Sequence, residues 1–451
     1  MPHLLAALGA LVALAHGGGM LAQRIGCPAV VGELVAGIAL GPTLLGRLDP
    51  ALSAWLVAPG GETGGALRFV GQLGVILLMF GAGLEMRSLL ARRDLPTVAW
   101  IAALGVLVPI TIGVLLLMLV PVARYVGAAD NVTALRVVLV TALAVTSIPV
   151  VTRIFADLGL LGTRLARLVL GVAVLEDVLV YVALSWAVSL AAGSTAESAR
   201  VPSLLGIEPG GMASIAWHVA ASVALVWGGV HAGRVVEVAR RRGAGSPLLR
   251  RNPLATVLAF LFACTAFAAV LGLVPMLGAL VAGLALAASE RPGLRLAIGQ
   301  VRAVASALFV PVFFVLTGAS LDLLGAFDPR SCIALLTVGV LAKGVGVWLG
   351  ARLAGESRSS TRALVVSLNA RGGPGIVLAT TAFAAGIVDA RMYTSLILLA
   401  VLTSIGAGAW LARFARTAAL PTHHDHHPEN AAWPRPTPPA PSISSAMGAR
   451  S

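Results

Sequence analysis

The chain has 451 residues, of which 58% are hydrophobic and only 11% are charged, and its formal net charge is +13. This composition excludes an ordinary soluble globular protein and indicates a polytopic membrane protein. The basic residues occur in short clusters between apolar segments, so membrane topology explains the positive charge better than nucleic-acid binding does.

Long apolar segments follow one another along most of the chain. Taking about 20 apolar residues as the length that spans a bilayer, we predict an all-α membrane protein with about 13 transmembrane helices. They lie near residues 4–22, 28–46, 66–86, 96–122, 134–157, 163–191, 213–238, 253–271, 273–289, 301–323, 331–354, 361–385 and 392–416. No positively charged stretch precedes the first segment, so we expect it to span the membrane rather than to be a cleaved signal peptide.

The loops between these segments predict the orientation of the chain. Arginines are about three times as frequent on one side as on the other, which places the N-terminus outside and the C-terminus in the cytoplasm. Residues 417–451 are rich in proline, alanine and histidine, and we expect a disordered cytoplasmic tail there. Its histidine-rich run, residues 423–427, could bind zinc or nickel or sense pH, but we favour a solvated, unstructured tract.

Two short sequence patterns occur twice, in the same order. GELVAGIAL at residues 32–40 returns as GALVAGLAL at 278–286, and FGAGLEM at 80–86 is echoed by TGASLDL at 317–323. Chance similarity between helices rich in glycine, alanine and leucine is the alternative explanation. We favour a duplication of six segments around one intervening helix, which gives two repeats of inverted topology. One transmembrane domain, residues 1–416, would then hold repeat 1 (about 4–191), a linker helix (about 213–238) and repeat 2 (about 253–416).

The fifth and twelfth segments each contain residues that interrupt helical hydrogen bonding. Pro149 lies in the fifth, and the run Gly372, Gly373, Pro374 and Gly375 lies in the twelfth. A simple kink in each helix is one interpretation. Because the two positions correspond in the proposed repeats, we instead predict two discontinuous helices that meet at a binding site near the middle of the membrane.

The sixth segment carries two adjacent carboxylates, Glu176 and Asp177, and the eleventh carries Lys343, the only lysine of the chain. A charge at the centre of the bilayer costs on the order of 3 kcal/mol, so such residues are functional candidates. We assign Asp177 to a monovalent cation, with the hydroxyls of Thr146 and Ser147 as further oxygen ligands. Glu176 is assigned either to proton binding or to a partner such as Lys343, because neighbouring helical residues point about 100° apart.

A family resemblance rests on several motifs in order. They are GCPAVVGELVAGIALGPTLLG at 26–46, LGVILLMFGAGLEM at 73–86, SIPVVTRIFADLGL at 147–160, the Glu-Asp pair at 176–177, and NARGGPGIVLA at 369–379. In these residues the chain resembles the monovalent cation:proton antiporter-2 family of sodium or potassium/proton exchangers. The resemblance implies a thirteen-helix fold with two crossed broken helices, a separate dimerising domain, and elevator-like alternating access.

The resemblance also implies roles for individual residues. The acid pair Glu176 and Asp177 would bind the ion and Lys343 would pair with these acids. Arg371, which follows the second break, would pair with Glu85 or Glu33 as structural support. The pair here is Glu-Asp, whereas relatives described as electrogenic commonly carry Asp-Asp, so the stoichiometry is left open.

We therefore expect a multi-pass protein of the bacterial inner (plasma) membrane that exchanges sodium or potassium for protons. It would be a homodimer in contact with membrane lipid, with no enzymatic activity and no cofactor. Two alternatives remain: a proton-coupled exporter of a small organic cation, and a membrane sensor or scaffold that has the same fold and does not transport.

Overall fold

The structure is a computed structural model of the full chain. It describes residues 2–24, 27–57, 61–86, 94–160, 163–192, 201–208, 211–241, 252–287, 289 and 291–417. Within these ranges the chain is helical, and its β-structure is one isolated antiparallel bridge between Val126 and Val388. The expected tail with its histidine run lies outside the described residues, apart from Thr417.

The helices of the first half, up to the linker, include one 3-10 turn, η3. They are α1 (Pro2–Arg24), α2 (Ala29–Leu40), α3 (Leu45–Leu48), α4 (Pro50–Val57), α5 (Gly61–Met86), α6 (Leu95–Leu119), η3 (Val122–Tyr125), α7 (Val132–Ala144), α8 (Ile148–Asp157), α9 (Arg164–Ala192), α10 (Val201–Leu204) and α11 (Met212–Arg241).

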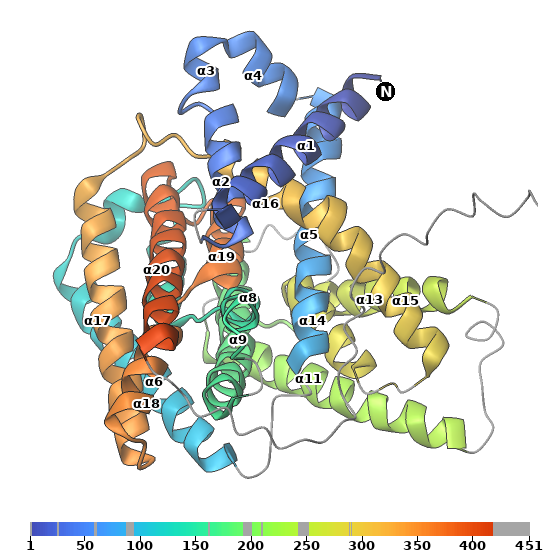
Figure 1. The fold of residues 1–451 in the computed structure, drawn as a ribbon, viewed down its shortest axis with the longest axis vertical. Coiled ribbons are helices and arrows are strands. Elements are labelled where there is room, and N and C mark those ends of the chain that lie inside the picture. The colour runs from blue at the N-terminus through green and yellow to red at the C-terminus, as the bar shows by residue number, and fades with distance from the viewer. Residues whose placement is uncertain are drawn as a thin grey trace, which may run out of the picture.

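The helices of the second half include one π-helical turn, η4. They are α13 (Pro253–Val270), α14 (Pro275–Leu286), α15 (Pro292–Val304), η4 (Ala305–Phe309), α16 (Val310–Ala319), α17 (Pro329–Leu353), α18 (Arg358–Ser367), α19 (Gly372–Ala384) and α20 (Ala390–Thr417). Figure 1 shows α8, α9 and α19 in the middle of the molecule, with α17 and α20 on one side of them and α5 and α14 on the other.

The described residues contain 11 helices that are long and apolar enough to cross a membrane. They include α15, η4 and α16 as one span and α18 with α19 as another. Two further predicted segments appear as the shorter apolar helices Val132–Ala144 and Pro275–Leu286. The polytopic all-α class is confirmed, whereas the count of thirteen spans is not. The tenth predicted segment, residues 301–323, also differs in its limits. The corresponding span of the structure begins at Pro292, a residue suited to a first helical turn, and ends at Ala319.

Packing in the second half repeats packing in the first. Helix α1 lies against α2 as α13 lies against α14, and α2 packs on α16 as α14 packs on α5. Glycines allow the last two contacts to be close. An added Cβ at Gly37 would lie 2.1 Å from the carbonyl oxygen of Val315, and one at Gly283 would lie 2.2 Å from that of Phe80.

These contacts also fix the alignment of the two repeated patterns. Gly318 faces Leu34 and Gly37, and Gly83 faces Leu280 and its neighbours in the same way. Gly83 therefore corresponds to Gly318. The alignment of FGAGLEM with TGASLDL, in which Gly81 corresponds to Gly318, is wrong by two residues because the letters match there but the helix contacts do not.

Helix α5 offers a matched test of this close packing. We expect Gly83→Ala to lower the free energy of unfolding by about 3 kcal/mol, because its Cβ would lie 2.0 Å from the carbonyl oxygen of Leu280. Gly81→Ala should leave it unchanged or raise it by up to about 1 kcal/mol, because no described atom lies within 4 Å of an added Cβ there and alanine favours the helix over glycine. Thermal unfolding of the purified variants in detergent measures both. Equal midpoints would contradict the glycine contact.

Two helices are interrupted where the sequence predicts interruptions, and the unwound residues cross. Residues 145–147 separate α7 from α8, and residues 368–371 separate α18 from α19. The amide of Ser147 donates to the carbonyl of Ala370 at 2.8 Å, and the hydroxyl of Thr146 donates to the carbonyl of Leu368 at 2.6 Å. The prediction of two discontinuous helices that meet is confirmed in this geometry.

The residues assigned to the breaks lie slightly further along the chain than the unwound segments. Pro149 is in the first turn of α8, and Gly372, Gly373, Pro374 and Gly375 are in the first turn of α19. Proline is tolerated in a first helical turn because its missing N–H would lack an intrahelical partner there, and it disfavours helix in the residue before it. The breaks therefore end at these residues rather than being centred on them.

Candidate functional site

Helix α9 carries the acid pair into the interior of the molecule. Glu176 is 1% exposed and Asp177 is 0% exposed. The two side chains have different surroundings, as their angular separation on the helix predicts. Among the residues that the structure describes, both carboxylate oxygens of Asp177 and Oε2 of Glu176 have no hydrogen-bond partner, whereas Oε1 of Glu176 is bonded to Lys343.

Lys343 on α17 is the partner of Glu176. Its Nζ lies 2.6 Å from Oε1 of Glu176, 2.5 Å from the carbonyl oxygen of Ala144 and 3.2 Å from that of Gly105. Three acceptors match the three protons of an ammonium group. The sequence left open which acid meets the lysine, and in this structure it is Glu176.

Small residues explain how the lysine reaches the carbonyl of Gly105. Helices α6 and α17 pack closely because glycine has no side chain at the contact. An added Cβ at Gly346 would lie 2.4 Å from the carbonyl oxygen of Leu104, and one at Gly350 would lie 2.7 Å from that of Trp100. Gly105 itself faces the ion pair, since a Cβ there would lie 3.2 Å from Oε1 of Glu176. The spacing of these glycines thus determines the depth at which Lys343 meets α6.

The break after Ala144 supplies the remaining acceptors. The last carbonyls of an α-helix have no intrahelical partner and carry partial negative charge, so they favour cations. Lys343 donates to the carbonyl oxygen of Ala144, and Arg371 donates to the carbonyl oxygens of Ala142 and Leu143 at 3.0 and 2.9 Å. Two buried cations, Lys343 of α17 and Arg371 of the unwound segment before α19, therefore stabilise the C-terminal end of α7.

The expected pairing of Arg371 with Glu85 or Glu33 is wrong. Besides the end of α7, Arg371 donates to the carbonyl of Gly339 at 2.7 Å and to the carbonyl and side-chain oxygens of Asn369. These acceptors satisfy the planar guanidinium group without a carboxylate. Glu85 pairs with Arg302 instead, and Glu33 is a buried side chain of α2 whose Oε2 has no partner in the described part of the chain.

Thr146 and Ser147 lie in the unwound segment, where both are fully buried. The hydroxyl of Ser147 accepts from the amide of Val150 at 3.4 Å and from the amide of Gly373 at 3.2 Å. One side chain thus caps the first turns of both α8 and α19. The structure therefore gives these hydroxyls bonds within the crossing, and their assignment as cation ligands stays a prediction.

Asp177 is the chemically incomplete member of this site. A buried carboxylate without hydrogen bonds is strongly disfavoured as an anion unless a positive charge or a proton neutralises it. Lys343 cannot complete it, since the lysine is already bonded to Glu176 and two carbonyls. In the part of the chain that the structure describes, no group of three or more His, Cys, Asp or Glu side chains could hold a metal ion. Either a proton or a singly charged cation would supply the one positive charge that a buried Asp177 carboxylate needs.

Sequence reasoning expected carbonyls at the helix breaks to attract a cation but named no individual backbone acceptor. The carbonyls of Ala142, Leu143 and Ala144 had a signal, because any helix that ends at a break leaves its last carbonyls free. Gly105 had none that distinguished it from the other glycines of the chain. Tyr181, one turn beyond Asp177, was also missed; it is fully buried, and its hydroxyl donates to the sulfur of Met79 on α5.

Comparison with known proteins gives concordant results. Residues 9–417 match the model of the family described as "Sodium/hydrogen exchanger, transmembrane". The chain is 29% identical over 395 residues to the Na(+)/H(+)-K(+) antiporter GerN of Bacillus cereus, covering 86% of this chain and 90% of that protein. It is 25% identical over 389 residues to a Na(+)/H(+) antiporter of Enterococcus hirae, covering 86% and 92%.

A solved structure supports the fold. The sodium proton antiporter MjNhaP1 from Methanocaldococcus jannaschii superposes with a TM-score of 0.63 over 92% of this chain and 98% of that chain, at 16% sequence identity. At this identity the likeness concerns the fold alone. Together with the family match, it confirms the resemblance that the sequence motifs indicate.

Proposed function

Because this chain belongs to the sodium/hydrogen exchanger family of multi-pass membrane proteins, we propose that it exchanges sodium or potassium for protons across the membrane. The observation that carries the proposal is Asp177, a fully buried carboxylate whose two oxygens have no partner among the described residues. The names of the relatives, which are sodium/proton and sodium/proton-potassium antiporters, support the same choice of substrates.

Competition at one carboxylate accounts for exchange. Asp177 needs one positive charge, and either a monovalent cation or a proton supplies it. If the site changes its exposure from one side of the membrane to the other only when Asp177 is neutralised, then each cation carried one way is replaced by protons carried the other way. In this scheme Glu176 and Lys343 form a preorganised ion pair beside the exchanging group.

The arrangement of the chain extends the proposal. Repeat 1 (about 4–191) and repeat 2 (about 253–416) would form one transmembrane domain around the linker helix (about 213–238), in keeping with their duplicated packing. The protein would be a homodimer in the bacterial plasma membrane, with its N-terminus outside and its C-terminus in the cytoplasm. Thr146 and Ser147 would add oxygen ligands when the crossing rearranges around a bound cation.

Transport by inside-out vesicles tests the function. We expect addition of sodium or potassium to dissipate an imposed pH gradient, measured as dequenching of a pH-sensitive dye, in vesicles that contain the protein and not in matched vesicles without it. Lithium and a small organic cation are added in parallel. A response to the organic cation alone would identify the exporter alternative, and no response to any cation would contradict exchange altogether.

A further inference from the structure

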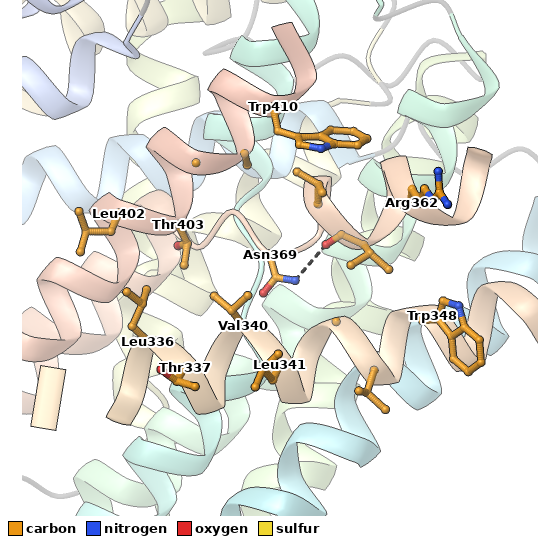
Figure 2. A pocket seen from close by; sticks show the side chains of 16 residues that line it. Leu336, Thr337, Val340, Leu341, Trp348, Arg362, Asn369, Leu402, Thr403 and Trp410 are labelled. Atoms are coloured by element: carbon orange, nitrogen blue, oxygen red, sulfur yellow. Dashed lines mark hydrogen bonds between the residues drawn. The ribbon is translucent and has the colours of Figure 1, made fainter. Parts of the chain in front are cut away.

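A groove lies along α17, α18 and α20. It encloses about 970 Å³, and Figure 2 shows the side chains that line it. Its lining is mainly apolar and includes Leu336, Val340, Leu341, Val345, Leu402 and Ala407. A cleft of this size is at the upper end of the range of about 300–1,000 Å³ that small-molecule sites occupy.

The groove lies in the part of the molecule that a bilayer would cover. The helices that form it belong to the spans Pro329–Leu353, Arg358–Ala384 and Ala390–Phe414. Leu341 and Trp348 are 61% and 50% exposed, so the described residues leave this apolar surface uncovered. Lipid chains are the apolar material that surrounds such a surface in a membrane.

A positive charge marks one end of the groove. Figure 2 shows Arg362 at that end, near Trp348, with Trp410 also at the lining. Arg362 is exposed and makes no hydrogen bond or ion pair with the residues that the structure describes. Arginine binds phosphate through paired N–H groups, and tryptophan is enriched at the level of lipid headgroups.

We propose that this groove binds an anionic phospholipid, with an acyl chain between α17 and α20 and the phosphate on Arg362. Basic pockets between transmembrane helices bind anionic headgroups in this manner. A zwitterionic lipid has the same chains, but its phosphate is already neutralised within the headgroup, so it binds the unpaired arginine less well.

The acyl chain would also lie against the crossing of the broken helices. Asn369 lines the groove, donates to the carbonyl of Val365 at 3.0 Å and accepts from Nη1 of Arg371 at 3.3 Å. Arg371 in turn holds the end of α7. The lipid would thus contact Asn369, which is hydrogen-bonded to Arg371, the residue that binds the end of α7.

Lipid titration of the purified, delipidated full-length protein tests the headgroup contact. Native mass spectrometry measures binding of dioleoyl phosphatidylglycerol and of dioleoyl phosphatidylcholine, which share their acyl chains. We expect phosphatidylglycerol to bind more tightly, and Arg362→Gln to weaken it about tenfold, the loss of one charge-assisted contact. Arg358→Gln, on the same helix outside the groove lining, is the matched control and should bind as the unaltered protein does.

A second variant tests the acyl-chain contact. Gly406 lines the groove and has no described atom within 4 Å of an added Cβ, so the leucine of Gly406→Leu can enter the groove without a clash at its Cβ. We expect it to weaken both lipids, whereas Gly299→Leu, another open glycine, on α15, should weaken neither. Unchanged phosphatidylglycerol binding in Arg362→Gln or in Gly406→Leu would overturn the proposal, as would equal affinity for the two lipids. The measurement does not depend on transport, so its failure leaves cation exchange untouched.

Discussion

Asp177→Asn is expected to abolish cation-dependent dissipation of the pH gradient, down to the level of vesicles without protein. The asparagine has nearly the same shape but neither carries a negative charge nor takes up a proton, so it can hold neither of the exchanged ions. The vesicle assay with sodium and potassium measures this. Full activity in the variant would remove Asp177 from its central role.

Stability separates this loss from misfolding. Asp177 is buried, and no described residue is a partner of either of its oxygens, so replacing it by a neutral amide removes a source of unfavourable free energy in the folded state. The thermal midpoint of Asp177→Asn should therefore equal or exceed that of the unaltered protein. Asp130→Asn is a matched control for transport, because Asp130 is exposed and has a φ of 46°, a conformation that asparagine also tolerates.

Lys343→Met is expected to destabilise the protein by about 3–5 kcal/mol, the usual effect of removing one partner of a buried ion pair. The variant leaves Glu176, which is 1% exposed, and the carbonyls of Gly105 and Ala144 without their common donor. Thermal unfolding in detergent measures the change. An unaltered midpoint would mean that the lysine contributes nothing to the fold.

The double variant Glu176→Gln/Lys343→Met provides the internal control. Both charges are then absent, so we expect much of the stability to return, with a coupling of about 3 kcal/mol between the two positions. The half-exposed pair of Arg302 and Glu85 is the external control. Arg302→Met should change the free energy of unfolding by less than about 1 kcal/mol, because solvent screens such pairs. Additive effects at 176 and 343 would contradict direct coupling.

The helices and the two breaks could be predicted because their signals are local. An apolar run of spanning length requires no knowledge of its neighbours, and neither does proline or clustered glycine in the middle of such a run. The positions of the breaks were predicted within a few residues. The prediction was not more precise because Pro149 and Pro374 fit a first helical turn. Each proline therefore marks where the second half-helix begins rather than the centre of the break.

The partners of the buried charges could not be predicted from the same signals. Arg371 was expected to need a carboxylate, but it is satisfied by carbonyl oxygens that the break in α7 leaves free. Which acid meets Lys343 depends on the rotation of α9 about its own axis relative to α17. That rotation follows from packing along the whole helix, which no single motif encodes. The alignment of FGAGLEM with TGASLDL was wrong because similar small residues fit more than one alignment, and only the helix contacts distinguish them.

The glycine contacts between the two halves bear on how the protein is made. Helix α2 packs on α16 and α5 packs on α14, so each half presents small-residue faces to the other half as well as to its own helices. The N-terminal half is synthesised first, so α2 and α5 enter the membrane before their partners α16 and α14, which begin at residue 275 or later. In the nascent first half, the faces of α2 and α5 that pack on α16 and α14 are therefore uncovered. Insertion of α14 and α16 is the step that covers them.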